Sequence, residues 1–147
     1  MAATDSQPEN FDLERFVTAQ QPLYAQVCAE LAAGHKSSHW MWWVFPQLRG
    51  LGSSPTAQRF GIGSLAEARA YLAHPLLGAR LRECTQLVNG IAGSSAQAIF
   101  GYPDYLKFRS CMTLFAAAAG RDETAFVTAL QKYFAGEADP LTRKLLV

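Results

Sequence analysis

Charged residues are scarce in this sequence of 147 residues. Asp, Glu, Lys and Arg together make up 17% of the chain, against about 25% in typical soluble domains. The net charge is +1, and the Lys and Arg residues are scattered along the chain. Proteins that bind nucleic acid or anionic membranes usually carry clustered basic residues. We therefore expect no nucleic-acid partner and no membrane partner.

Cysteine is also scarce, and long apolar runs are absent. The three cysteines, Cys28, Cys84 and Cys111, are far apart and form no Cys-x-x-Cys motif. This pattern favours a reducing compartment in which cysteine acts as a small apolar residue. No apolar run reaches the ~18 residues of a membrane span, and Met1 to Asn10 lacks the apolar segment of a signal peptide. We expect a cytoplasmic monomer or small homo-oligomer.

Alternating β-branched runs bounded by hairpin turns are missing, whereas helical spacing recurs along the whole chain. Residues 22–33 form an amphipathic pattern that ends at Gly34, and Ser64 with Glu67 forms a capping box. Residues 75–89 place Leu77, Leu81, Cys84 and Val88 on one stripe. The sequence predicts an all-α, single-domain bundle of about seven to eight short and medium helices over residues 11–147. Residues 1–10 are predicted to be a disordered tail.

The segment from His35 to Gln47 is the most unusual stretch of the chain. It holds all three tryptophans and two of the three histidines. Its helical stripes are apolar nearly all round, which is typical of a buried helix. Ser37 or Ser38 can cap this helix, and Pro46 limits it. Each indole N–H and imidazole nitrogen then needs a partner in the core or at a pocket rim.

The two histidines of this segment invite a metal or a catalytic interpretation. His35 and His39 are four residues apart, a spacing used for metal ligands, but no acid or cysteine pair completes a site, and we expect no metal. Burial among large apolar residues should lower the pKa of His39. A neutral imidazole suits a general base and suits a structural hydrogen bond equally well.

A second polar group lies near the start of the predicted helix at 103–119. Asp104 and Lys107 are three residues apart, and Ser110 and Thr113 continue the polar positions. One interpretation is an exposed ion pair with hydroxyls bonded back to helix carbonyls. The other requires this helix to pack against the tryptophan segment, so that Asp104 or Lys107 meets His39 or Gln47 in a cleft. No nucleophile elbow, Walker loop or dinucleotide fingerprint is present.

The remaining aromatic and histidine positions also have two interpretations. Trp40, Trp42 and Trp43 can stack a base or another ring, or they can simply fill the core. His74, followed by Pro75, is most simply a corner between two helices.

Several motifs together resemble one family. The run from His35 through Trp40, Phe45 and Gln47 to Leu48, with the pattern HKxSHWMWxxFPQL, is similar to the signature of a bacterial family of uncharacterised proteins often labelled calpastatin. The similarity continues through GLGxS at 50–54, YLxHP at 71–75 and the stretch 99–115, and Arg109 departs from it where a small polar residue is expected. The resemblance implies a compact all-helical domain. It does not imply calpain inhibition, because calpastatin itself is a disordered, charged inhibitor.

The resemblance also implies more polar signature residues than a core requires, enough to line one cleft between two helices. We expect a cleft that binds a small molecule, such as a nucleotide-like one, and that can hydrolyse it, without a cofactor. The alternatives are a protein-interaction module with no chemistry and a buried polar network that fixes helix packing. The candidate residues are His39, Asp104 and Lys107 for catalysis, and Lys36, Ser38, Trp40, Trp43, Gln47, His74, Ser110 and Thr113 for ligand binding.

Overall fold

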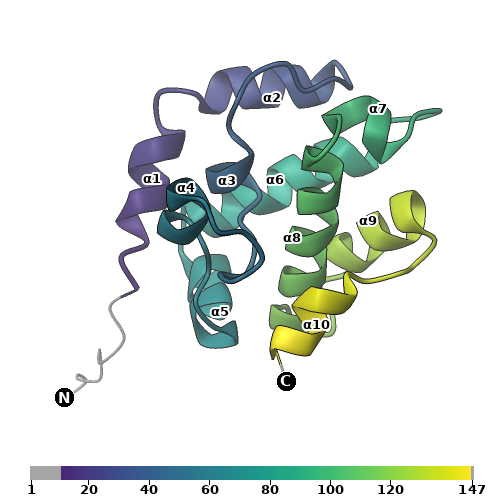
Figure 1. Cartoon of the computed structure of the whole chain (residues 1–147). Coiled ribbons are helices and arrows are strands. Elements are labelled where there is room, and N and C mark those ends of the chain that lie inside the picture. The colour runs from purple at the N-terminus through teal and green to yellow at the C-terminus, as the bar shows by residue number, and fades with distance from the viewer. Residues whose placement is uncertain (1–10, 147) are drawn as a thin grey trace.

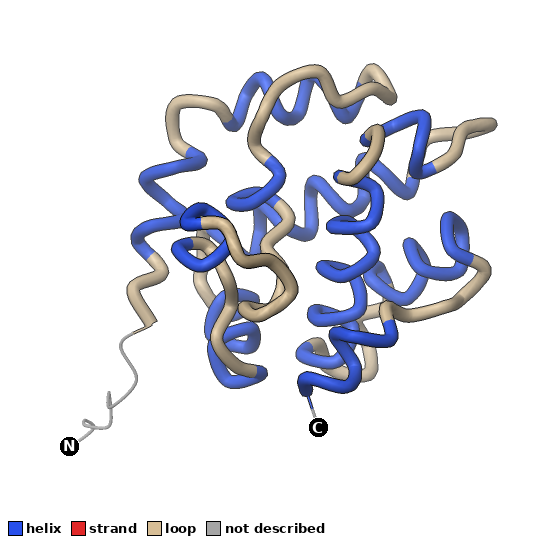
Figure 2. Tube along the Cα trace, viewed as in Figure 1, coloured by secondary structure: helices blue, strands red, loops and turns tan. Residues whose placement is uncertain are grey.

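Helices and loops build the whole of residues 11–146, the part of the chain that the computed structural model describes (Figures 1 and 2). The helices are α1 (Glu14–Gln20), α2 (Tyr24–Ala32), α3 (Met41–Val44), α4 (Pro55–Arg59), α5 (Leu65–Ala73), α6 (Leu77–Asn89), α7 (Ala96–Phe100), α8 (Asp104–Ala118), α9 (Ala125–Phe134) and α10 (Pro140–Leu146). The predicted all-α class is confirmed. The predicted number of seven to eight is wrong, since ten helices lie within the described residues. Three of them, α3, α4 and α7, have only four or five residues, too few to show a helical period. The predicted tail at 1–10 lies outside the described range.

Four helices form the centre of the molecule. α8 packs against α5 and α9, and α6 closes the group by packing against the same two helices (Figure 1). α6 buries Leu77, Leu81, Cys84 and Val88, which is the predicted stripe. α8 is buried in its middle part, at Phe108 and at every residue from Ser110 to Phe115. Six consecutive buried residues cover every side of a helix, so this part of α8 lies at the centre of the fold.

The N-terminal part of the chain covers this centre. α2 packs on α6, and the single turn α3 lies between α1 and α8 (Figure 1). The loop after α3 is fixed to the loop before α5 by an isolated parallel bridge between Leu48 and Ile62. Within residues 11–146, none of the helices has the length and hydropathy needed to cross a membrane.

Helix ends follow the local sequence at several positions. Ser64 accepts a hydrogen bond from the Glu67 amide, and the Glu67 carboxylate accepts one from the Gly63 amide. Ser54 caps α4 in the same way, and Gly34 adopts a positive φ of 77° just after α2. Glycine favours that conformation because it has no Cβ. Ser95 caps α7 by accepting a hydrogen bond from the Ala98 amide.

The tryptophan segment departs most from its prediction. Neither Ser37 nor Ser38 caps a helix there, and the only helical part of the described segment is the single turn α3, which begins after Trp40 with no side-chain cap. The Ser38 hydroxyl donates instead to the Glu30 carboxylate, at 2.6 Å. His39 was expected to be buried, but it is exposed to solvent. Residues 35–40 therefore form a loop, bent at Ser38 and His39, rather than a buried helix.

Candidate functional site

A small cavity of about 100 Å³ lies between the loop that precedes α3 and the first turns of α8. We call it the lysine–tryptophan pocket. Its lining combines charged side chains with aromatic ones, and consists of Lys36, His39, Trp40, Met41, Trp42, Trp43, Asp104 and Lys107. The packing of α3 against α8 brings these two stretches together, although they are more than sixty residues apart in sequence.

Asp104 is the centre of the charged group. Its carboxylate forms ion pairs with Lys36, at 2.7 Å through Oδ2, and with Lys107, at 3.2 Å through Oδ1. The Lys36 side chain is only 6% exposed, whereas those of Asp104 and Lys107 are 19% and 22% exposed. Lys36 also donates to the Ser38 carbonyl at 2.6 Å. Both carboxylate oxygens of Asp104 therefore face an ammonium group.

The two lysines also contact the tryptophans. The Lys36 ammonium lies 5.0 Å from the centre of the Trp40 ring, and that of Lys107 lies 4.3 Å from the centre of the Trp42 ring. Such distances allow a favourable cation–π interaction. Trp40 is buried, and Trp42 and Trp43 are half-buried. The Trp43 ring packs on Phe60, and its Nε1 is buried with no hydrogen-bond partner among the described residues.

The loop that carries Lys36 is held by a second carboxylate, Glu30 of α2. Glu30 is 8% exposed, and all the hydrogen bonds that it accepts from residues 11–146 come from neutral donors. They are the Gln26 amide at 3.0 Å, the Ser37 and Ser38 backbone amides at 2.8 and 3.1 Å, the Ser38 hydroxyl at 2.6 Å and the Trp40 indole at 2.9 Å. We call these groups the Glu30 cluster. It fixes residues 37–40 on the end of α2.

The pKa of Glu30 follows from this arrangement. Burial alone would raise the pKa by disfavouring the charged carboxylate. The hydrogen bonds from Ser38, the Ser37 amide, Gln26 and Trp40 favour the charged form more strongly, and the pKa lies well below its ordinary value. Glu30 is therefore ionised throughout the neutral range.

Six of the predicted site residues meet in the lysine–tryptophan pocket, and five do not line it. The six are Lys36, His39, Trp40, Trp43, Asp104 and Lys107. The other five are Ser38, which belongs to the Glu30 cluster, and Gln47, His74, Ser110 and Thr113. No hydrogen bond of the His39 ring to another described residue occurs.

The residues outside the pocket have structural contacts. His74 accepts hydrogen bonds at Nδ1 from the Leu76 and Leu77 amides, at 3.1 and 3.2 Å, which caps the start of α6. Ser110 donates to the Leu106 carbonyl at 3.1 Å. Thr113 donates to the Arg109 carbonyl and accepts from the Asp139 amide, both at 2.8 Å, which ties the α9–α10 loop to α8.

Two residues of this region are not among the predicted site residues. Trp42, which the sequence suggests as a stacking or core residue, lines the pocket. One feature of the sequence could have pointed to Glu30. It lies beside the buried positions Val27 and Leu31 of the predicted helix. An acid at the border of an apolar stripe needs several donors to be buried there.

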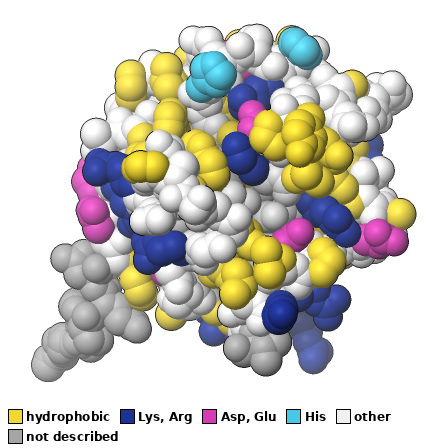
Figure 3. All heavy atoms as spheres, viewed as in Figure 1, with side chains coloured by type: hydrophobic (Ala, Val, Ile, Leu, Met, Phe, Trp, Pro, Cys, Tyr) yellow, Lys and Arg dark blue, Asp and Glu magenta, His cyan; other side chains and the backbone are white. Residues whose placement is uncertain are grey.

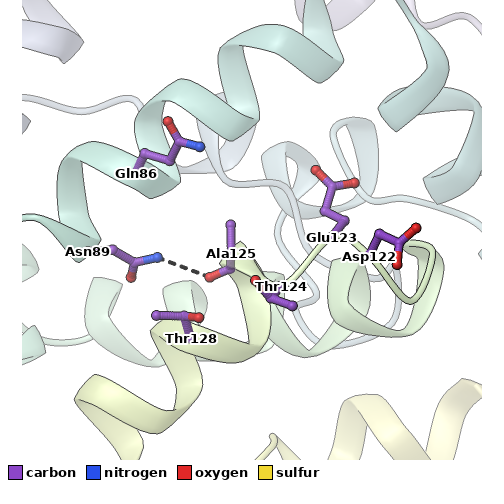
Figure 4. Close-up of a pocket in the computed structure, with 7 residues that line it drawn as sticks. All are labelled: Gln86, Asn89, Asp122, Glu123, Thr124, Ala125 and Thr128. Carbon is purple, nitrogen blue, oxygen red and sulfur yellow. Dashed lines mark hydrogen bonds between the residues drawn. The ribbon is translucent and has the colours of Figure 1, made fainter.

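Other parts of the described surface offer less chemistry. A wider cavity of about 550 Å³ lies between α6 and the start of α9 (Figure 4). There the Asn89 amide donates to the Ala125 carbonyl at 3.0 Å, and the Glu123 carboxylate is paired with Arg82. No group of three or more His, Cys, Asp or Glu side chains in residues 11–146 is placed to share a metal ion. On the face shown in Figure 3 the basic side chains are dispersed.

Comparisons with known proteins agree with the fold but bring no activity. A family model described as "Protein of unknown function (DUF1810)" matches residues 10–146. The chain is also similar to a solved structure, the conserved hypothetical protein Rv1873 from Mycobacterium tuberculosis. The two are 59% identical over 94% of this chain and 98% of that chain, with a TM-score of 0.92. No curated protein matches the chain.

Proposed function

The chain belongs to the DUF1810 family of proteins of unknown function, and we propose that it binds a small anionic ligand with an aromatic ring, of the nucleotide kind, at the lysine–tryptophan pocket. The observation that carries the proposal is the charge balance of this pocket. Two ammonium groups, of Lys36 and Lys107, share the one carboxylate of Asp104. One positive charge is left over beside apolar walls, where its attraction for an anion is stronger than in water.

The two lysines have different parts in this proposal. An ammonium group has three donors. Lys36 uses two of them, for Asp104 and for the Ser38 carbonyl, and its remaining side faces Trp40. Lys107 has one hydrogen bond among the described residues, to Asp104, and is more exposed. Lys107 is therefore the group that contacts the anion, and Lys36 positions Asp104.

The size of the cavity limits what enters it. About 100 Å³ corresponds to roughly three water molecules at about 30 Å³ each. A phosphate or carboxylate group fits this space, whereas a whole drug-sized ligand needs about 300–1,000 Å³. The anionic group therefore enters the cavity, and the ring of the ligand stays at the rim. Trp42, half-buried there, supplies an aromatic face to that ring.

A hydrolytic step at this site would use His39 rather than Asp104 as the base. Both oxygens of Asp104 are occupied by lysine ammonium groups, so neither is free to take a proton from water. His39 lines the same pocket, is exposed and has no hydrogen bond to another described residue. A neutral imidazole with a free ring nitrogen can accept a proton from water.

The test is calorimetric titration of the protein with adenosine monophosphate, adenosine and inorganic phosphate. We expect adenosine monophosphate to bind more tightly than phosphate, and adenosine not to bind. Lys107→Met keeps the length of the side chain and removes its charge, and it should weaken binding about tenfold or more. Lys144→Met, at an exposed position of α10, is the matched control and should bind as the parent does. Equal binding by Lys107→Met and the parent, or no binding of either anion, would refute the proposal.

A protein-interaction surface is the second candidate, and one observation favours it. Tyr102 and Leu106, next to Asp104 in sequence, are 78% and 39% exposed. Exposed aromatic and aliphatic side chains of this kind can anchor a protein partner. The tryptophans do not extend this surface, because Trp40 is buried and the other two line the cavity. Tyr102→Ala separates the candidates, since it should remove a protein contact and leave phosphate binding unchanged.

A further inference from the structure

The pocket proposed to bind an anion already contains a carboxylate, that of Asp104. This carboxylate lies 2.7 Å from the Lys36 ammonium and 3.2 Å from that of Lys107. Among the described residues that line the pocket, Asp104 is the one acidic side chain. An anion that binds Lys107 therefore shares this ammonium group with a carboxylate of the same sign. Like charges brought together in this way repel each other strongly where water is excluded.

From this geometry we infer that Asp104 determines the charge of the ligand that the lysine–tryptophan pocket accepts. The accepted class is a phosphate monoester, which carries about two negative charges above neutral pH. Ligands of the same shape with a single negative charge are rejected. This inference rests on the proposed function, because it concerns the same pocket and the same kind of ligand. It adds the class of anion and the residue that selects it.

The selection follows from the competition between Asp104 and the ligand for the same ammonium groups. A singly charged ligand only replaces the carboxylate as the partner of Lys107, so Asp104 loses the attraction that the ligand gains. A phosphate monoester brings a second charge, and its attraction to the two lysines exceeds that of the carboxylate, because Coulomb energy grows with the product of the charges. Only the doubly charged ligand therefore gains free energy by sharing the lysines with Asp104.

Each lysine has a second contact that holds it in the pocket independently of Asp104. Lys36 donates to the Ser38 carbonyl at 2.6 Å. The Lys107 ammonium lies 4.3 Å from the centre of the Trp42 ring, within range of a cation–π interaction. Removing the charge of Asp104 therefore leaves both ammonium groups in the pocket, with two positive charges in place of one. If Asp104 only positioned the lysines, its removal would have the opposite effect and weaken the binding of every anion.

The experiment is calorimetric titration of the full-length protein with two ligands that differ in charge but not in shape. Adenosine monophosphate ends in a phosphate monoester, and adenosine 5′-sulfate ends in a tetrahedral sulfate monoester with one negative charge. At about pH 8, where the phosphate is doubly charged, the parent should bind the phosphate about tenfold or more tightly than the sulfate. Asp104→Asn keeps the shape of the side chain and removes its charge. It should bind the sulfate about tenfold or more tightly than the parent does, and the phosphate more tightly as well.

Asp122→Asn is the matched control, because it removes the same charge at an exposed position beside the wider cavity between α6 and α9. It should bind both esters as the parent does. If the parent binds the two esters equally, or Asp104→Asn binds the sulfate no more tightly than the parent, the inference is overturned while the proposed function stands. If the parent binds neither ester, the proposed function fails as well. If Asp104→Asn does not fold, the two esters in the parent still decide whether the pocket selects the phosphate.

Discussion

Two carboxylates bind the same short loop, Glu30 through neutral donors and Asp104 through a charged lysine. Glu30 accepts five hydrogen bonds, all from neutral donors, and its cluster carries one negative charge. Asp104 is paired with two lysines, and its cluster carries one positive charge. The donors around Glu30 are satisfied within the protein. Around Asp104, a charge and several lysine donors remain available to a ligand. The Glu30 cluster therefore stabilises the fold, while the Asp104 cluster can bind a ligand.

The largest effect is expected from Glu30→Ala. This change leaves the Trp40 indole, the Ser38 hydroxyl and two backbone amides without their acceptor. Hydrogen bonds to a charged group contribute about 1.5–3 kcal/mol each, and water replaces some of them, so the free energy of unfolding should fall by about 3 kcal/mol or more. Urea denaturation measures it. Glu137→Ala is the control, because this side chain is 76% exposed and its loss should cost under about 0.5 kcal/mol. A loss below about 1 kcal/mol for Glu30→Ala would contradict the structural role.

Acid should remove the same stabilisation gradually. The pKa of Glu30 in the folded protein lies below its ordinary value of 4.5, so the unfolded chain takes up the proton first. The stabilisation from Glu30 is then complete above that ordinary value and is lost as the pH falls below it. The parent should lose more stability than Glu30→Gln between about pH 5 and about pH 3. Urea midpoints of both proteins across this range measure the effect, and parallel curves would count against it.

A smaller effect is expected at the second carboxylate. Lys36→Met removes one of the two partners of Asp104 from a nearly buried position, and should lower the free energy of unfolding by about 2 kcal/mol. Lys107→Met removes the more exposed partner and should cost under about 1 kcal/mol. The comparison therefore predicts that Lys36 matters mainly for stability and Lys107 mainly for binding. Equal losses of stability in the two variants would show that the two lysines do not have these separate roles.

The smallest effect is expected for His39→Ala. His39 is exposed and has no hydrogen bond to another described residue, so its loss should change the free energy of unfolding by less than about 0.5 kcal/mol. His74→Ala is the matched comparison, because it removes the acceptor that caps α6 and should cost about 1 kcal/mol. Thermal melts of the two variants measure the contrast. A large drop for His39→Ala would mean that this histidine is part of the scaffold.

The helices that could be predicted from sequence are those whose signals are local. The Ser64 cap and the Gly34 end are confirmed because each depends on residues within one turn. The α6 stripe is confirmed for the same reason, since a regular apolar period needs no distant partner.

The tryptophan segment could not be predicted in this way, because a distant side chain decides its conformation. The Ser38 hydroxyl can cap a helix or bond to Glu30, and nothing near Ser38 in the sequence shows that Glu30 is available. Once Ser38 bonds to Glu30, residues 37–40 form a loop and His39 is exposed to solvent. Asp104 and Lys107 were predicted to meet this segment if α8 packed against it, and α8 does so. Their contacts there are with Lys36 and Trp42, whose positions depend on that loop.

The Glu30 cluster also limits how the sequence can vary among related proteins. Gln26, Glu30, Ser38 and Trp40 satisfy one another through a single carboxylate, so a change at one position leaves the others with polar atoms that are costly to bury. We therefore expect these four positions to vary together among relatives. A relative that replaces Glu30 should also replace Trp40 or Ser38, and its loop should take another path. Residues 26–40 should therefore be conserved or replaced together, because together they position Lys36.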